Sequence, residues 1–210
     1  MCIHNHQLCI NDLAFKHEHY VLFSKLHQII NPGEMIQVRG HNGSGKSTLL
    51  RILAGFLEPH KGMVTWNGHC ITKNREDYIE NMTYIGHLNG IKSNLTVYEN
   101  LRLKCTLFSS SKDLNIILKK IGLEANSQIH AQNLSAGQLR RLCLAQLMLT
   151  SAKLWILDEP NTALDDAGQS LLNTLVIEHI ANKGMAVIAT HQALTLTPTK
   201  TIFLGDHHAT

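Results

Sequence analysis

The sequence predicts an α/β fold in which a parallel sheet carries helices on its faces, and two observations lead to this prediction. Short apolar runs alternate with helix-forming segments, and repeated strand-then-helix units of this kind build a parallel sheet. Two of the runs, 154–157 and 185–190, are apolar at nearly every position, which is typical of strands buried on both faces. We expect one domain over residues 1–210, with an antiparallel β layer before the parallel core and a helical lobe inserted into it.

The antiparallel β layer is predicted from the N-terminal part of the chain. A turn signal at 31–34, Asn-Pro-Gly-Glu, separates two of its strands. The dipeptide Asn67-Gly68 follows another strand and favours a β-hairpin. Apolar strands are expected at 7–10, 20–23, 35–38 and 62–66.

The inserted helical lobe is predicted at about 89–150, where apolar residues recur at three- and four-residue spacing. Gly122 is expected to end its second helix, and Ser135 to cap its third. The predicted helices of the lobe lie at 97–108, 113–121 and 134–150. Strand-and-helix alternation then resumes, with the strand at 154–157, a helix at 166–182 and strands at 185–190 and 201–204.

Composition excludes several classes of protein. A net charge of +3, with 17% of residues charged and no basic run, argues against a nucleic-acid partner. No apolar run is long enough to predict a transmembrane helix, and no signal peptide is expected at the N-terminus. The five cysteines form no C-x-x-C pair, which indicates reduced thiols. The fourteen histidines show no recognised ligand spacing, which indicates surface residues rather than a metal or haem site.

A glycine-rich segment lies between a predicted strand and a predicted helix, and it fits G-x-x-x-x-G-K-[ST]. Glycines let successive backbone N–H groups turn toward phosphate oxygens, and the start of the following helix adds unpaired N–H groups. Lys46 is expected to place its charge between the β- and γ-phosphates, and the Ser47 hydroxyl to bind Mg²⁺. The segment therefore predicts a nucleoside triphosphate site made by Gly40, His41, Asn42, Gly43, Ser44, Gly45, Lys46, Ser47 and Thr48.

Two carboxylates, Asp158 and Glu159, follow the apolar strand 154–157. Ligands in α/β sheets bind outside the carboxyl ends of the strands, and the glycine-rich segment also follows a strand, so we expect the two sites to meet. Asp158 is predicted to hold Mg²⁺ through water, and Glu159 to polarise the attacking water. An Asp-Glu-Pro turn after a core strand is the simpler interpretation, and the phosphate segment upstream decides against it.

A second helix start with phosphate-binding character lies at 134–138, Leu-Ser-Ala-Gly-Gln. A hydroxyl, a small residue and a glycine stand where a helix leaves its N–H groups unpaired, so Ser135, Gly137 and Gln138 are predicted to contact phosphate. An ordinary helix cap has the same residue types. The chemistry of these residues gives no reason for two such helix starts in one chain.

The order of these segments resembles that of the ATP-binding-cassette (ABC) ATPases, which have a P-loop NTPase core. The resemblance covers nearly the whole chain and includes 40–48, 134–138, 157–160 (Leu-Asp-Glu-Pro), 163–165 (Ala-Leu-Asp) and His191. It implies that the chain binds ATP and Mg²⁺ and that two copies pair head-to-tail as a homodimer. Each ATP would then lie between the 40–48 segment of one copy and the 134–138 segment of the other.

The resemblance also implies roles for single residues. Glu159 is implied to be the general base, and Lys46 and His191 to complete the catalytic set, with His191 as the switch histidine that senses the γ-phosphate. The family usually has a glutamine that contacts Mg²⁺ and faces the membrane subunits, and His87 occupies that position here. The aromatic residue that stacks on adenine in the family could be any of His17, His19 and Tyr20.

Finer features resemble the haem-exporter ATPases of the cytochrome c maturation system. They include 50–55, 84–87, 90–92, 134–138 followed by Arg140-Arg141, 154–160 and 189–192. The resemblance implies integral membrane permease subunits as partners, and a peripheral location on the cytoplasmic face of the bacterial inner membrane. An ABC ATPase for another cargo, such as a lipoprotein or a peptide, is the first alternative. A non-transport ABC protein would be expected to have two cassettes or a long coiled-coil insertion, and this sequence has neither.

Overall fold

The computed structural model describes residues 6–18, 20–86, 90–190 and 197–205. The chain forms two compact units. Unit 1 contains 1–84, 152–159 and 179–210, and unit 2 contains 85–151 and 160–178.

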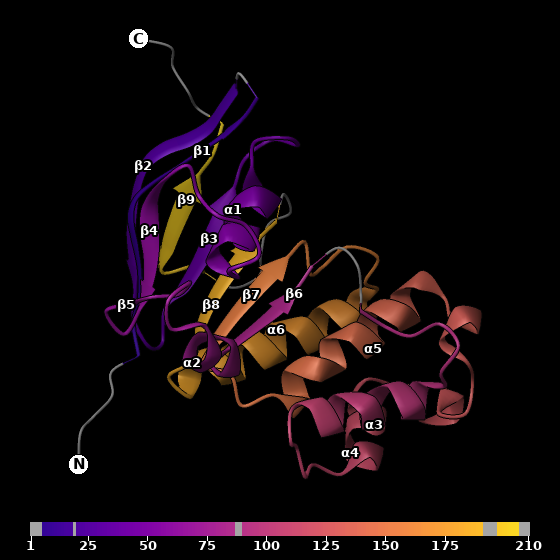
Figure 1. Cartoon of the computed structure of the whole chain (residues 1–210). Coiled ribbons are helices and arrows are strands. Elements are labelled where there is room, and N and C mark those ends of the chain that lie inside the picture. The colour runs from indigo at the N-terminus through magenta and orange to yellow at the C-terminus, as the bar shows by residue number, and fades with distance from the viewer. Residues whose placement is uncertain (1–5, 19, 87–89, 191–196, 206–210) are drawn as a thin grey trace, which may run out of the picture. The chain divides into compact units, whose positions relative to one another are not determined.

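An antiparallel sheet forms one layer of unit 1, with strand order β2-β1-β4-β5 (Figure 1). Its strands are β1 (Leu8–His17), β2 (Tyr20–Ile30), β4 (Lys61–Trp66) and β5 (His69–Cys70). The first two strands are longer than predicted. Asp12 and Lys25 have positive φ, 49° and 51°, and the β1–β2 register shifts along the pair, so apolar and polar residues no longer alternate regularly. The hairpin predicted at Asn67-Gly68 is confirmed, since β4 and β5 pair across it.

A second sheet of unit 1 has strand order β6-β7-β8-β3-β9, and the pairs β7–β8, β8–β3 and β3–β9 are parallel. Every residue of β7 and β8 is buried, as the continuous apolar runs predicted. The strands are β3 (Met35–Arg39), β6 (Met82–Ile85), β7 (Leu154–Asp158), β8 (Met185–Ala189) and β9 (Lys200–Phe203).

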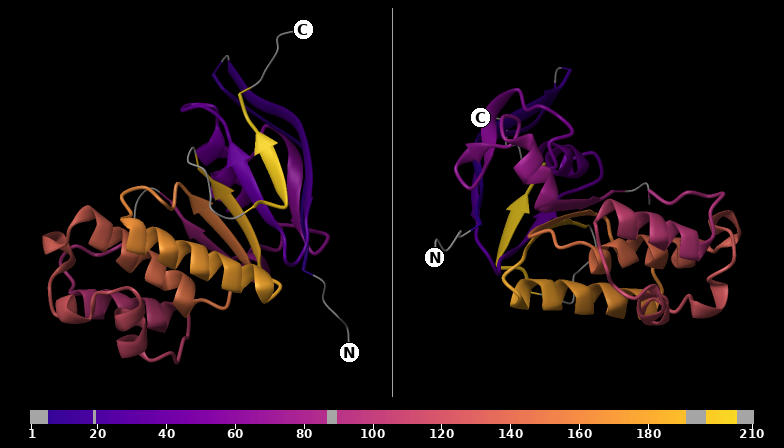
Figure 2. Two further views of the ribbon diagram at one scale, coloured as in Figure 1. Left: turned by 180° about the vertical axis from the view of Figure 1, so that it is seen from behind. Right: turned by 60° about the horizontal axis from the view of Figure 1, so that its bottom comes forward.

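Helix α1 (Lys46–Leu53) lies between the two sheets of unit 1 (Figures 1 and 2). Its residues Leu49 and Leu53 are fully buried in a core that takes in residues of both sheets, such as Leu8 and Ile36. Helix α2 (Arg75–Glu80) was not predicted, because six residues are too few to show a helical period.

Unit 2 is built from helices. Helix α3 packs against both α4 and α5 (Figure 1). Capping boxes start two of them: Thr96 pairs with Glu99 at α3, and Ser135 pairs with Gln138 at α5. The helices are α3 (Val97–Leu107), α4 (Leu114–Lys120), α5 (Ala136–Leu149) and α6 (Asp166–Ala181), whose last turn belongs to unit 1; the 3₁₀ turns are η1 (Glu124–Asn126) and η2 (Ala131–Asn133).

Within the described ranges, none of the helices combines the length and the apolar character that a membrane crossing needs. The cysteines found there, Cys9, Cys70, Cys105 and Cys143, are free thiols.

Candidate active site

The carboxyl ends of three neighbouring strands bring the predicted residues of unit 1 together. Strand β8 lies between β7 and β3, and Ala189 is the register partner of both Asp158 and Val38. Since neighbouring strands are about 4.8 Å apart, Asp158 and the end of β3 are separated by roughly 10 Å. The glycine-rich segment leaves β3 directly, so it and the two carboxylates share one edge of the sheet.

The glycine-rich segment forms a tight loop that needs its glycines. A Cβ atom on Gly40 would lie 2.3 Å from the Ser44 hydroxyl oxygen and 2.4 Å from the Leu204 carbonyl oxygen. Gly43 and Gly45 have φ of 83° and 96°, in the region that side chains disfavour. The loop therefore brings backbone groups together with no side chain in the way, as a phosphate cradle requires.

Lys46, the first residue of α1, holds its charge inside this loop. Its ammonium group donates to the carbonyl oxygens of Gly40 at 2.9 Å and His41 at 3.1 Å, and the residue is only 7% exposed. The two bonds bend the side chain back over the loop. The charge thus stands at the N-terminus of α1, where the helix dipole adds to it.

Hydroxyl groups lie beside this charge. Ser47 and Thr48 occupy the first turn of α1 and are partly exposed. The Ser44 hydroxyl is buried, and it has no hydrogen-bond partner among the residues that the structure describes. The loop therefore offers hydroxyls, helix N–H groups and one ammonium, which is a donor set for phosphate oxygens.

Asp158 ends β7 and is 1% exposed. The Tyr84 hydroxyl in β6 interacts with the Asp158 carboxylate, an interaction that sequence analysis missed. Burial raises the pKa of Tyr84 to about 12, with further contributions from this interaction, so the tyrosine stays protonated. Asp158 and the glycine-rich segment before α1 share one edge of the sheet, and the Asp158 carboxylate and the Ser47 hydroxyl are hard oxygen ligands that suit Mg²⁺.

Glu159 is held in an unusual backbone conformation. Its φ is 47°, which is rare for a residue with a long side chain, and its N–H donates to the Ala189 carbonyl at 2.8 Å. This bond fixes the first residue beyond β7 to β8. The side chain is 7% exposed, so a carboxylate is presented at the strand end with little access for bulk water.

In unit 2, the predicted phosphate-contacting residues stand at the start of α5. The Ser135 hydroxyl accepts from the Gln138 N–H at 3.2 Å, and the Gln138 side-chain oxygen accepts from the Ser135 N–H at 2.9 Å. A Cβ on Gly137 would lie 3.1 Å from the Ala163 carbonyl, so glycine lets the helix start approach the 163–165 turn closely. These residues belong to a different unit from the glycine-rich loop.

Three of the predicted residues, His19, His87 and His191, lie outside the described residues. Of the alternatives for the adenine contact, His17 and Tyr20 face each other across the β1–β2 turn. Leu22, two residues after Tyr20, lies next to the glycine-rich loop: a Cβ on Gly45 would stand 3.1 Å from the Leu22 Cβ. Tyr20 is 76% exposed, so its ring is accessible from solvent.

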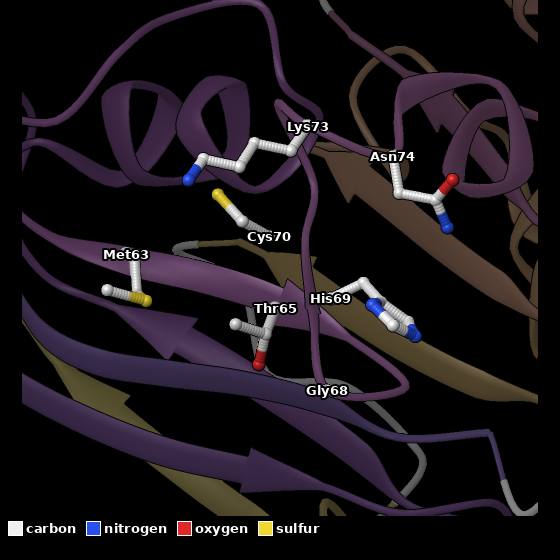
Figure 3. Close-up of a pocket in the computed structure, with 7 residues that line it drawn as sticks. All are labelled: Met63, Thr65, Gly68, His69, Cys70, Lys73 and Asn74. Atoms are coloured by element: carbon white, nitrogen blue, oxygen red, sulfur yellow. The ribbon is translucent and has the colours of Figure 1, made fainter.

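A hollow of about 600 Å³ lies elsewhere in unit 1, beside β4 and β5 (Figure 3). Figure 3 shows Lys73 reaching toward the Cys70 thiol, and a hydrogen bond with Thr72, helped by the Lys73 charge, lowers the pKa of that thiol. None of the predicted ATP or Mg²⁺ residues lines the hollow. Its lining residues are Met63, Thr65, Gly68, His69, Cys70, Lys73 and Asn74.

Comparison with known proteins shows the family to which the chain belongs. The family model described as "ABC transporter" matches residues 23–162. A solved structure, "Structure of ATP binding subunit of ABC transporter", superposes with a TM-score of 0.84 at 25% identity, over 94% of this chain and 85% of that one. A putative ABC transporter ATP-binding protein from Pyrococcus furiosus has the same fold, with a TM-score of 0.81 over 94% and 97% of the two chains. The chain belongs to the ATP-hydrolysing ATP-binding subunits of the ABC transporter family.

Within that family the chain is similar to proteins named cytochrome c biogenesis ATP-binding export protein CcmA. The CcmA of Haemophilus influenzae is 38% identical over 207 residues, which cover 97% of this chain and 98% of that protein. The CcmA of Nitrosomonas europaea is 46% identical over 179 residues, which cover 84% of each. The similarity thus extends over the described site in both units.

Proposed function

We propose that this chain hydrolyses ATP to drive the export or delivery of haem for cytochrome c biogenesis. The observation that carries the proposal is the near full-length similarity to CcmA, an ATP-binding export protein of cytochrome c biogenesis. The site supports the same chemistry, since one sheet edge holds a glycine-rich loop, a buried lysine and two carboxylates.

The chain's own residues divide the work of hydrolysis. The loop from Gly40 and the N-terminus of α1 bind the phosphates, and Lys46 neutralises the charge that grows on them. Glu159 orients the attacking water and takes a proton from it. Its nearly buried position excludes other water molecules. We assign His191 to contact the γ-phosphate.

The donor set fits a magnesium ion. We propose that the Ser47 hydroxyl and the Asp158 carboxylate hold it, because both are hard oxygen donors at one sheet edge. By its resemblance to the family position, we also assign His87 a contact with the ion through water. The interaction of Tyr84 with the Asp158 carboxylate helps to keep that carboxylate oriented. The ion, when bound, supplies positive charge to the β- and γ-phosphates.

We also propose that two copies act together, head-to-tail. The support is that Ser135, Gly137 and Gln138 form a second helix start with anion-binding character that belongs to unit 2, whereas the phosphate loop belongs to unit 1. In a head-to-tail pair, each helix start faces the ATP bound by the other copy. Residues 1–210 then act as one ATPase domain, in which the helical segment at about 89–150 is the lobe that faces the transporter.

The partners in this proposal are integral permease subunits, and the location is the cytoplasmic face of the bacterial inner membrane. A membrane co-purification from the native cell tests it, with Glu159→Gln used to hold the ATP-bound complex together. Recovery of the membrane subunits of cytochrome c maturation supports the proposal. Recovery of a different permease would leave the ATPase in place and overturn the haem assignment, and recovery of ribosomes without a membrane protein would overturn both.

A further inference from the structure

Arg140 is a buried arginine that the reaction described above does not use. It lies in the second turn of α5, directly after the helix start that carries Ser135, Gly137 and Gln138, and it is only 4% exposed. Guanidinium groups are costly to bury unless their N–H donors are paired. A buried arginine at this position therefore calls for partners, and the described residues include two backbone carbonyls that accept from it.

Both of these partners are backbone carbonyls in unit 2 that come from distant parts of the chain. The Arg140 Nε donates to the Pro160 carbonyl at 3.0 Å, and its Nη1 donates to the Gly86 carbonyl at 3.1 Å. Each carbonyl is one peptide away from a residue of the proposed site. Pro160 follows Glu159, the proposed base, and Gly86 precedes His87.

The chemistry of arginine makes this a rigid connection. The guanidinium is planar and permanently charged, and its N–H donors point in fixed directions, so bonds to two carbonyls also fix the spacing between them. A lysine has one rotatable ammonium group and cannot impose that spacing. Arg140 thus joins the start of α5 to Pro160, which follows Glu159, and to Gly86, which precedes His87.

We propose that Arg140 is a positioning residue, which couples the α5 helix start to Glu159 through Pro160 and to the backbone at Gly86. When the helix start of one copy engages the ATP bound by its partner, Arg140 carries that displacement to the Pro160 and Gly86 carbonyls of its own copy. Hydrolysis in each site then depends on engagement of the other. This inference rests on the proposed function, because it requires ATP hydrolysis by a head-to-tail pair.

The next residue provides a matched control. Arg141 lies on the same helix and also donates to one carbonyl, that of Ile121 at the end of α4, at 3.1 Å. That carbonyl belongs to the helical part of unit 2 and is not next to a proposed site residue. Loss of Arg141 removes a similar bond, so it reports what a merely structural arginine does.

The experiment compares R140Q, R140K and R141Q in the full-length chain. Three quantities are measured: the affinity for a fluorescent ATP analogue, kcat with its dependence on ATP concentration, and the thermal unfolding midpoint. For R140Q we expect kcat to fall at least about 10-fold, nucleotide affinity to stay within about twofold and the Hill coefficient to approach one. R140K should recover part of kcat. R141Q should keep kcat within about threefold, even where its unfolding midpoint falls.

Several outcomes would overturn the inference. Wild-type kcat in R140Q would do so, and so would an equal loss of kcat in R141Q, because either result makes Arg140 an ordinary structural residue. If R140Q does not fold, R140K decides the question: wild-type kcat and cooperativity in that folded variant contradict the coupling. Failure of the proposed function has a different signature, since a wild-type chain with no ATP hydrolysis, or E159Q at the wild-type rate, would contradict the site itself.

Discussion

The N–H of Glu159 donates to the carbonyl of Ala189 at 2.8 Å, and this bond joins the residue after β7 to the last residue of β8. It holds Glu159 at a φ of 47°, a conformation that costs on the order of 1 kcal/mol or more for a side chain of this kind. The fold thus maintains a strained backbone at the residue that we assign as the base.

The first prediction concerns the Glu159 side chain. Glu159→Gln keeps the size of the side chain and the backbone bond to Ala189, and it removes the carboxylate. We expect ATP affinity to be retained and kcat to fall at least about 100-fold, the usual contribution of a general base. Steady-state hydrolysis and gel filtration with ATP measure both effects, and a stable dimer should be found. Hydrolysis at the wild-type rate would show that another residue is the base.

The second prediction uses two glycines of the phosphate loop as a matched pair. In Gly40→Ala, the new methyl would lie 2.4 Å from the Leu204 carbonyl, which cannot move without shifting the backbone, so we expect nucleotide affinity to fall at least about 10-fold. In Gly43→Ala, no atom of the described chain lies within 4 Å, and the cost is only the strain at a φ of 83°, about 1 kcal/mol. Titration with a fluorescent nucleotide compares them. Equal affinity losses would contradict the steric explanation.

The third prediction concerns Tyr84 and the Asp158 carboxylate. Tyr84→Phe removes the hydroxyl that interacts with Asp158 and leaves the ring in place. Loss of such an outer ligand contact commonly weakens metal binding by about 10-fold or more, so the Mg²⁺ concentration that half-activates hydrolysis should rise by about that factor. The control is Tyr98→Phe on α3, which lies in unit 2. An unchanged Mg²⁺ requirement in Tyr84→Phe would show that Tyr84 does not support the metal site.

The fourth prediction decides between Tyr20 and His17 as the adenine contact. Tyr20 lies two residues along β2 from Leu22, which is next to Gly45 of the phosphate loop. Stacking on a base is worth about 1 kcal/mol or more, so Tyr20→Ala should raise the KM for ATP about 5- to 10-fold with little change in kcat. Tyr20→Phe should behave like the wild type, and His17→Ala should have little effect. The reverse pattern would assign the contact to His17.

Local patterns in the sequence predicted the parts of the fold that local chemistry determines. The buried strands β7 and β8 were expected because their residues are apolar throughout, and the turn at Asn67-Gly68 because those residues favour a hairpin. The extent of β1 and β2 was not predicted. The register shifts at positive-φ residues such as Lys25 interrupt the alternation on which a strand prediction depends.

The candidate site was predictable in its residues but not in its supporting contacts. A spacing rule can identify Lys46, because the helix and loop around it are contiguous in sequence. The Arg140 bond to Gly86 joins residues 54 positions apart, and the interaction of Tyr84 with Asp158 connects two different strands. No local pattern encodes such pairings, because they arise only when the chain has folded.

The last prediction concerns His179, whose ring stacks on that of Trp155. The two ring centroids are 3.8 Å apart and the interplanar angle is 6°. Burial, the dominant cause, lowers the pKa of His179 to about 4, although its Nε2 lies 3.1 Å from the Met185 carbonyl. In the unfolded chain the same imidazole has a pKa of about 6.5. Between pH 4 and 6.5 the unfolded chain binds a proton at His179 and the folded chain does not. The contribution of His179 to the free energy of unfolding is therefore complete above pH 6.5 and is lost as the pH falls toward 4.

The size of this effect follows from the two pKa values. The free energy of unfolding should decrease by about 2 kcal/mol between pH 7 and pH 5 on account of His179. His179→Phe keeps a flat ring against Trp155 and cannot take up a proton, so it should be less stable at pH 7 but lose this part of the pH dependence. Urea unfolding of both proteins at the two pH values measures the difference. An identical decrease in wild type and variant would assign the pH dependence to other groups, because the variant lacks only the titrating imidazole.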